Sequence, residues 1–247
     1  MFFPRLVLAE EVRRLIMLSI SLSGIKNGFI LGLLFAGVST FAEFEGKKLK
    51  WKGYTKTEFK VGEYAAFVVE PKTITQGKPW VWRARFPTYH TEIDELLLAD
   101  GYHIAHINTG SKLGSPKALA IWKEFYDLLT TQYGLNQKMA LEGVSRGGLY
   151  VYRWAKNYPQ TVACIYNDTP VCDFKSWPGG KGKGKGAKGE WKRVLKEYGF
   201  TNEAEALAYA DNPIDNLQPI VDARIPIMHI VTEDDAIVPP EENTYVL

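Results

Sequence analysis

Apolar and polar residues follow two different periods along this chain. Short apolar runs bounded by Gly, Pro or polar residues predict buried strands, and longer segments between them carry apolar residues at helical spacing. The predicted strands lie at residues 54–70 (two strands joined at residues 62–63), 80–86, 102–108, 139–141, 161–167 and 225–231, and the predicted helices at residues 92–100, 116–133, 146–158 and 203–209. Because strands and helices alternate, the pattern predicts an α/β protein with a parallel sheet and right-handed crossovers.

The segment 138–152 contains the motif G-x-S-x-G, formed by Gly143, Ser145 and Gly147 with Val144 and Arg146 between them. A strand is predicted before the motif and a helix after it. On such a sharp turn the serine is forced into strained backbone geometry, which exposes its hydroxyl at the carboxyl end of a sheet. It also lies at a helix N-terminus, whose free N–H groups favour developing negative charge. A Gly-rich turn with an ordinary serine is the alternative, and the flanking strand and helix favour a nucleophile elbow.

With this motif the sequence resembles the α/β-hydrolase superfamily, from about Lys56 to the C-terminus, and it looks most similar to bacterial esterase-like and prolyl-oligopeptidase-like members that carry G-x-S-R-G-G. The resemblance implies the α/β-hydrolase fold, a mostly parallel sheet with helices on both faces and an antiparallel start at residues 54–70. It also implies that Ser145 is the nucleophile and that an oxyanion hole forms from the Arg146 N–H and an N–H of the loop 85–88, with Phe86 as the first candidate. The HGGG form of that loop is absent here.

An acidic turn, residues 232–239, follows the last predicted strand. It resembles the family stretch in which an Asp-rich turn precedes Val-Pro, and matching on Val238 and Pro239 makes Asp235 the triad acid. Such a carboxylate holds the histidine in one tautomer and offsets its transient positive charge. Asp234 and Glu233 are the alternatives, as is a solvated acidic turn without a catalytic role.

The chain order of the triad in this fold is serine, acid, histidine. All four histidines precede Asp235: His90, His103, His106 and His229. We therefore expect the histidine to lie beyond Leu247, the last strand and helix of the fold to be missing, and residues 1–247 alone to be nearly inactive. A rewired site that uses His90 is one alternative, and a non-catalytic, hydrolase-like binding protein is another. His103, His106 and His229 are expected to be packed or hydrogen-bonded inside the protein.

The composition fits one domain, because 247 residues with 46% hydrophobic content can bury a single sizeable core. Of the 30 basic and 28 acidic residues, four and two lie in residues 1–42, which leaves 26 of each sign in the remainder. A neutral body argues against nucleic acid as a partner. Cys164 and Cys172 have neither C-x-x-C spacing nor a paired histidine, so no metal and no cofactor are expected. Two unpaired buried thiols are favoured over a disulfide.

The N-terminus predicts export. Residues 28–42 are uncharged, Lys26 precedes them, and Thr40 and Ala42 are small residues at the spacing that a signal peptidase recognises. The run is short for a membrane span. We therefore expect a signal peptide at residues 1–42, with Met17 as an alternative start, a hydrolase domain at residues 43–247 that is incomplete at its C-terminus, and a secreted or periplasmic protein with no stable membrane span after cleavage. An uncleaved anchor is the alternative.

The leading hypothesis is an exported serine hydrolase that cleaves carboxylic esters, with a serine peptidase of the prolyl-oligopeptidase type as the alternative. Four tryptophans could stack on sugar rings and suggest carbohydrate-linked esters, although core packing explains them equally well: Trp80, Trp82, Trp177 and Trp191. Residues 168–189 are rich in Lys and Gly but lack the GK[ST] ending of a phosphate-binding loop. They are either a mobile, solvated loop or a flap beside the active site that faces an acidic substrate.

Overall fold

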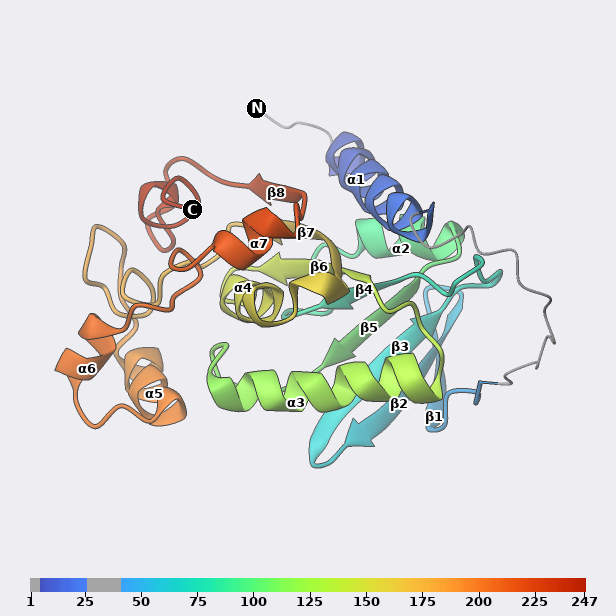
Figure 1. Ribbon diagram of the computed structural model, residues 1–247, viewed down its shortest axis with the longest axis horizontal. Helices are drawn as coiled ribbons and strands as arrows, with labels where there is room; N and C mark the ends of the chain where they lie inside the picture. The colour runs from blue at the N-terminus through green and yellow to red at the C-terminus, as the bar shows by residue number, and fades with distance from the viewer. Residues whose placement is uncertain (1–4, 26–40) are drawn as a thin grey trace.

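A mixed sheet of eight strands forms the centre of the molecule in the computed structural model, which describes residues 5–25 and 41–247. The strand order is β1-β2-β3-β5-β4-β6-β7-β8 (Figure 1). The strands are β1 (Lys47–Trp51), β2 (Tyr54–Val61), β3 (Tyr64–Glu70), β4 (Trp80–Arg83), β5 (His103–Ile107), β6 (Met139–Val144), β7 (Val162–Asp168) and β8 (Ile227–Ile230). The first three strands and β5 pair antiparallel, whereas β5, β4, β6, β7 and β8 are parallel. Both the parallel sheet and the antiparallel hairpin 54–70 are therefore confirmed.

Helices cover both faces of the sheet, with α3 and α4 on one side and α1 and α2 on the other (Figure 1). They are α1 (Arg5–Ile25), α2 (Glu92–Ala99), α3 (Pro116–Asp127, continued by a π-helix over Leu128–Gln132), α4 (Gly147–Asn157), α5 (Lys188–Tyr198), α6 (Glu203–Ala208) and α7 (Gln218–Asp222). The Ser115 side chain accepts a hydrogen bond from the Ala118 N–H at the start of α3, which is the N-cap that the sequence predicts. The expected fold class, a sheet with helices on both faces, is confirmed.

The core between the sheet and α3 and α4 is aromatic. Trp80 and Trp82 are fully buried there, and the ring of Trp82 stacks on that of Trp122 with centroids 4.1 Å apart. Offset stacking adds to the free energy gained from burying these large apolar surfaces. Trp80 and Trp82 are therefore core residues and are not available to stack on a sugar ring.

Helix α1 packs on the opposite face of the sheet beside α2. Its Val12 and Ile16 are fully buried, and the Arg13 guanidinium binds the Asp100 carboxylate, with Nη2 2.7 Å from Oδ1. Most of the uncharged run 28–42 lies outside the described residues, so the signal peptide stays a prediction. In residues 5–25 and 41–247, no helix is long and apolar enough to cross a membrane.

Candidate active site

Ser145 and Arg146 connect the end of β6 to the start of α4, and the backbone of Ser145 is left-handed with a φ of 51°. Few residues other than glycine adopt this conformation. Three backbone hydrogen bonds hold it: the Ser145 N–H donates to the Asp168 carbonyl (2.9 Å), and the Ser145 carbonyl accepts from the N–H groups of Gly148 (3.1 Å) and Val171 (2.9 Å). The strand, sharp turn and helix expected around the motif are thus present, whereas the catalytic role of Ser145 stays a prediction.

Close approach explains two glycines around Ser145. A Cβ atom at Gly143 would lie 2.0 Å from Asn167 Oδ1 on β7, and one at Gly148 would lie 2.6 Å from the Val171 carbonyl oxygen. Gly147 is different, because a Cβ atom there would make ordinary contact at 3.6 Å with Ala84. The elbow therefore needs glycine for close packing at the first and last positions of G-x-S-R-G-G.

The loop after β4 lies against the start of α4 and brings the two expected oxyanion residues together. Phe86 has a left-handed φ of 51°, and its ring centroid is 5.7 Å from the Arg146 guanidinium. The strand ends at Arg83, earlier than the expected strand 80–86, so Phe86 belongs to the loop. The Arg146 N–H precedes the first turn of α4, where amides lack an acceptor within the helix. Their role in an oxyanion hole stays a prediction.

The Lys- and Gly-rich segment after β7 packs beside the elbow. Its Trp177 is buried, and the Trp177 ring centroid lies 5.0 Å from the Arg146 guanidinium, which also approaches Glu190 of α5 at 3.4 Å. The exposed lysines meet acidic groups of the protein itself, since Lys183 Nζ is 3.1 Å from Glu241 and Lys181 pairs with Glu203. The segment thus lies next to the elbow, where the flap hypothesis puts it. Lys181 and Lys183, however, bind acidic groups of the chain itself and not a substrate.

The alternation of Lys and Gly in this segment has a packing cause. A Cβ atom at Gly182 would lie 2.2 Å from Glu242 Oε1, and one at Gly184 would lie 2.7 Å from Pro239 Cδ. The glycines therefore approach residues 239–242 while the intervening lysines remain exposed. This contact joins the segment after β7 to the one that follows the acidic turn.

Asp235 occupies a turn after β8, and its side chain is held there. Its Oδ1 accepts hydrogen bonds from the N–H groups of Ile237 (2.8 Å) and Val238 (2.9 Å), whereas the alternatives Glu233 and Asp234 are exposed. Parallel pairing aligns Val144, Asp168 and Ile230 across β6, β7 and β8. The strands that lead into the Ser145 and Asp235 turns therefore end at the same edge of the sheet, with β6 and β8 about 10 Å apart at two strand spacings.

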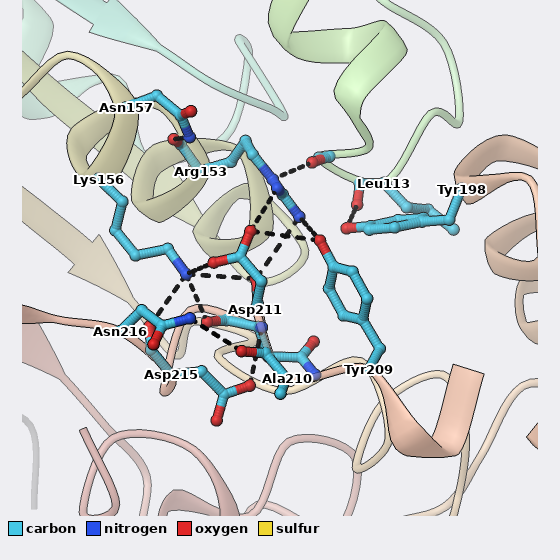
Figure 2. Close-up of polar contacts among 12 residues, drawn as sticks. Leu113, Arg153, Lys156, Asn157, Tyr198, Tyr209, Ala210, Asp211, Asp215 and Asn216 are labelled. Atoms are coloured by element: carbon cyan, nitrogen blue, oxygen red, sulfur yellow. Dashed lines mark hydrogen bonds and ion pairs between the residues drawn. The ribbon is translucent and has the colours of Figure 1, made fainter. Parts of the chain in front are cut away.

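Helix α4 is anchored by a polar cluster on its outer side. Figure 2 shows the Asp211 carboxylate between two α4 side chains, with Oδ2 2.8 Å from Arg153 Nη1 and Oδ1 2.6 Å from Lys156 Nζ. Burial opposes ionisation of Asp211, but the hydrogen bond and charge of Lys156 and the charge of Arg153 outweigh it and lower the pKa of Asp211. The cluster ties residues 209–216 to the helix that carries the elbow.

Solved structures with similar coordinates are hydrolases. Puromycin hydrolase matches with 18% identity over 76% of this chain and 32% of that protein, at a TM-score of 0.57. An acylaminoacyl peptidase of Pyrococcus horikoshii matches with 14% identity over 89% and 36% at 0.54, and a proposed lipase of Acinetobacter baumannii AYE with 14% identity over 78% and 79% at 0.50. The chain has the α/β-hydrolase fold. It spans about a third of the length of puromycin hydrolase and of the acylaminoacyl peptidase. No family model and no curated protein matches the sequence.

Within this α/β-hydrolase fold, three of the four histidines are hydrogen-bonded inside the protein. His103 Nδ1 lies 3.3 Å from the Pro79 carbonyl oxygen and His106 Nδ1 2.8 Å from that of Arg83. His229 contacts the Tyr152 hydroxyl through Nε2 (2.6 Å) and Thr244 Oγ1 through Nδ1 (3.0 Å). Burial lowers the pKa of each ring to about 4, which keeps all three neutral. Their expected role in packing is confirmed.

His90 differs from the other three. It lies in the loop after β4 with a left-handed φ of 50° and lines a cavity of about 300 Å³ together with Asp168 and Tyr166. Burial raises the pKa of Asp168, and the charge of His90 opposes that shift. Among the histidines of the described residues, His90 is therefore the one placed to contact a molecule bound in this cavity.

The cysteines, possible metal ligands and buried charged residues complete the description of the site. Cys164 and Cys172 are both buried and unpaired, as expected. Over residues 5–25 and 41–247, no group of three His, Cys, Asp or Glu side chains is arranged to hold a metal ion. Sequence reasoning missed three charged side chains buried beneath the elbow, Arg83, Asp94 and Glu142. The signal was available, because Arg83 and Glu142 interrupt otherwise apolar strands.

Proposed function

We propose that this protein is a serine hydrolase that cleaves carboxylic esters through an acyl-enzyme on Ser145. One observation carries the proposal: Ser145 has a left-handed backbone between a parallel strand and a helix, at the sheet edge from which the Asp235 turn also emerges. A strained serine in this setting is the nucleophile elbow of α/β-hydrolases. Hydrolases among the structurally similar proteins support the same class.

In the proposed reaction, Ser145 Oγ attacks the ester carbonyl carbon while its proton passes to a histidine. The N–H groups of Arg146 and Phe86 stabilise the oxyanion that forms. The histidine then returns the proton to the leaving alcohol, and the acyl group remains on Ser145. A water molecule, deprotonated by the same histidine, releases the acid and restores the serine. Asp235 holds the histidine in the required tautomer.

We propose that this histidine follows Leu247 in the natural protein. His103, His106 and His229 are neutral and hydrogen-bonded elsewhere, which supports a base from another segment. Residues 1–247 alone should then hydrolyse esters about 10³-fold more slowly than a chain that carries the base. Equal rates would assign the base to a histidine already present, and His90→Gln would then abolish turnover.

The decisive experiment is labelling of the full natural chain with a fluorophosphonate, together with turnover of p-nitrophenyl acetate. Ser145→Ala should abolish both. Ser111→Ala is the matched control, because Ser111 is half-buried like Ser145 and its hydroxyl accepts a hydrogen bond from Arg193. Labelling that persists in Ser145→Ala would reject Ser145 as the nucleophile. Faster cleavage of a p-nitroanilide than of the ester with the same acyl group would favour the serine peptidase instead.

We also propose that the protein is exported and acts on a small-molecule or carbohydrate-linked ester. Residues 28–42 support export, and a mature N-terminus at Glu43 in the exported fraction would be its test. The carbohydrate proposal now rests on Trp177, which is 7% exposed where Trp80 and Trp82 are fully buried, and whose ring lies beside Arg146 of the elbow. Trp177→Ala should raise KM for an acetylated sugar more than KM for p-nitrophenyl acetate.

A further inference from the structure

Three ionisable side chains are buried beneath the elbow, and one of them, Arg83, contacts the other two. Arg83 at the end of β4 is 1% exposed, as is Asp94 of α2, and Glu142 of β6 is 2% exposed. Arg83 Nη1 lies 2.5 Å from Asp94 Oδ2, and Arg83 Nη2 lies 3.2 Å from Glu142 Oε1. Removing such groups from water is costly, so their retention at the site suggests a role other than stability.

The same guanidinium binds the loop that follows β4. Arg83 Nη2 donates to the carbonyl oxygens of Tyr89 (2.5 Å) and Phe86 (3.4 Å, a weaker contact). Two residues of this loop, Phe86 and His90, have left-handed backbones, each of which costs about 1–3 kcal/mol and persists only if its surroundings hold it. Arg83 is placed to hold both ends of this strained turn.

The cluster also joins the loop to the strand that carries the nucleophile. Glu142 precedes Ser145 by three residues on β6, and its backbone carbonyl accepts a hydrogen bond from the Ala84 N–H at 2.8 Å. One guanidinium therefore connects α2, the loop that carries Phe86, and β6. An arginine suits this position, because its planar fork of five donors can bind two carboxyl groups and a carbonyl at once.

We propose that Arg83, held by Asp94 and Glu142, is a positioning residue that fixes the Phe86 N–H relative to Ser145 as part of the oxyanion hole. This inference rests on the proposed function. Arg83 touches neither the nucleophile nor the substrate and acts through the carbonyls of Phe86 and Tyr89. Its contribution therefore belongs to the step in which negative charge develops, and substrate binding does not depend on it.

Two variants test this in the full natural chain with p-nitrophenyl acetate as the substrate. Arg83→Lys keeps a positive charge but loses the planar fork of donors. Asp94→Ala removes the carboxylate of α2 that holds Arg83 Nη1, and Asp94 itself bonds neither the loop carbonyls nor β6 in the described residues. We expect kcat to fall at least about 10-fold in both, toward the loss of about 10²-fold that follows removal of one oxyanion donor. KM should remain unchanged, and Asp94→Asn should restore part of the rate.

A second measurement separates positioning from folding. A trifluoromethyl ketone forms an oxyanion on the nucleophile, so its affinity should weaken by the same factor as kcat in Arg83→Lys and Asp94→Ala. Arg153→Lys is the control, because Arg153 is also buried and binds a carboxylate and a carbonyl, but not this loop. It should lower Tm while kcat per labelled site stays within about threefold.

The possible results distinguish the two levels of the proposal. Wild-type protein that neither reacts with the fluorophosphonate nor turns over ester would reject the proposed function itself. Active wild type, with kcat and inhibitor affinity within twofold in folded Asp94→Ala and Arg83→Lys, would reject the positioning role. If Arg83→Lys fails to fold, the Asp94→Ala and Asp94→Asn pair decides alone.

Discussion

Four of the nine non-glycine residues with a left-handed backbone in residues 5–25 and 41–247 lie at one edge of this sheet. Ser145, Phe86, His90 and Thr169 have φ values between 43° and 51°, and they lie in the turns after β6, β4 and β7. Each left-handed residue other than glycine costs about 1–3 kcal/mol, so such residues persist where hydrogen bonds and packing hold them. Hydrogen bonds from Ser145 to the Asp168 carbonyl, from Val171 to the Ser145 carbonyl and from Arg83 to the loop carbonyls supply that support. The strain marks the same edge as the candidate active site.

Two adjacent glycines of the elbow should respond differently to substitution. Gly148→Ala places a methyl group 2.6 Å from the Val171 carbonyl and should lower the free energy of unfolding by about 1–3 kcal/mol. Gly147→Ala meets only ordinary contact at 3.6 Å in the first turn of α4, where alanine is the better helix former. Its stability should therefore be unchanged or slightly higher. Urea unfolding of both variants checks this, and equal losses would show that the elbow is looser than described.

The acid of the proposed triad can be tested by a neutral substitution. Asp235→Asn should keep the turn, because its amide oxygen can still accept from the N–H groups of Ile237 and Val238. Turnover of p-nitrophenyl acetate in the full natural chain should nevertheless fall by about 10⁴-fold, as expected when the histidine is held in the wrong tautomer. Asp234→Asn is the control and should stay near wild type. A larger loss in Asp234→Asn would move the acid by one position.

Elements were predictable where their hydrophobic pattern was strong. The hairpin of β2 and β3 and the helix α3 follow clear periodicity with Gly or a Ser-Pro cap at their ends, and the sequence predicts them within a few residues. Strand β1 (KKLKW) is almost entirely exposed, shows no apolar pattern and is stabilised by pairing with β2. Helix α5 does carry apolar residues at helical spacing, which the sequence prediction missed: Trp191, Val194, Leu195 and Tyr198.

The candidate site shows the same division. The motif around Ser145 and the acidic turn around Asp235 are local in sequence, and both were found. The Arg83 cluster is not local, because Arg83, Asp94 and Glu142 come from three elements that meet only after the sheet forms. A charged residue in a buried strand signals a partner but does not identify it. The place of Trp177 beside Arg146 likewise depends on how the segment after β7 folds back.

The burial of Cys164 by helix α1 gives a prediction for that element. Cys164 lies in the apolar cluster that includes Ala9, Val12 and Ile16, and burial raises the pKa of its thiol to about 12. In the full-length chain neither cysteine should react with iodoacetamide. Removal of residues 1–42, as signal cleavage would do, should expose Cys164 while Cys172 stays buried in the other cluster. Mass spectrometry after brief labelling measures this, with Cys164→Ser to assign the site. An unreactive Cys164 would mean that α1 does not cover it.

Across the whole molecule, burial suppresses charge on both kinds of titratable group. His103, His106 and His229 stay neutral because burial lowers the pKa of each to about 4. Burial also raises the pKa of Glu142 to about 8 and that of Asp94 to about 6, and in both cases it outweighs the attraction of Arg83. At neutral pH we therefore expect the Arg83 cluster to hold an ion pair with Asp94 and a protonated Glu142. Arg83 Nη2 lies 3.2 Å from Glu142 Oε1, so a neutral Glu142 remains in contact with the guanidinium.

This protonation state makes the stability of the whole molecule depend on pH in a direction opposite to that of an ordinary ion pair. Between about pH 4.3, where Glu142 titrates in the unfolded chain, and about pH 8, the folded protein holds a proton that the unfolded chain has lost. The free energy of unfolding therefore falls as pH rises, by up to about 1.4 kcal/mol per pH unit from this one group. Glu142→Gln keeps a neutral hydrogen-bond acceptor but cannot titrate, so it lacks this pH-dependent contribution to the free energy of unfolding. Urea denaturation from pH 5 to pH 8 measures the free energy of unfolding of wild type and of Glu142→Gln. The difference between the two should shift steadily in favour of the variant over this range and level off above pH 8. A difference that does not change with pH would show that Glu142 is ionised beside Arg83 throughout.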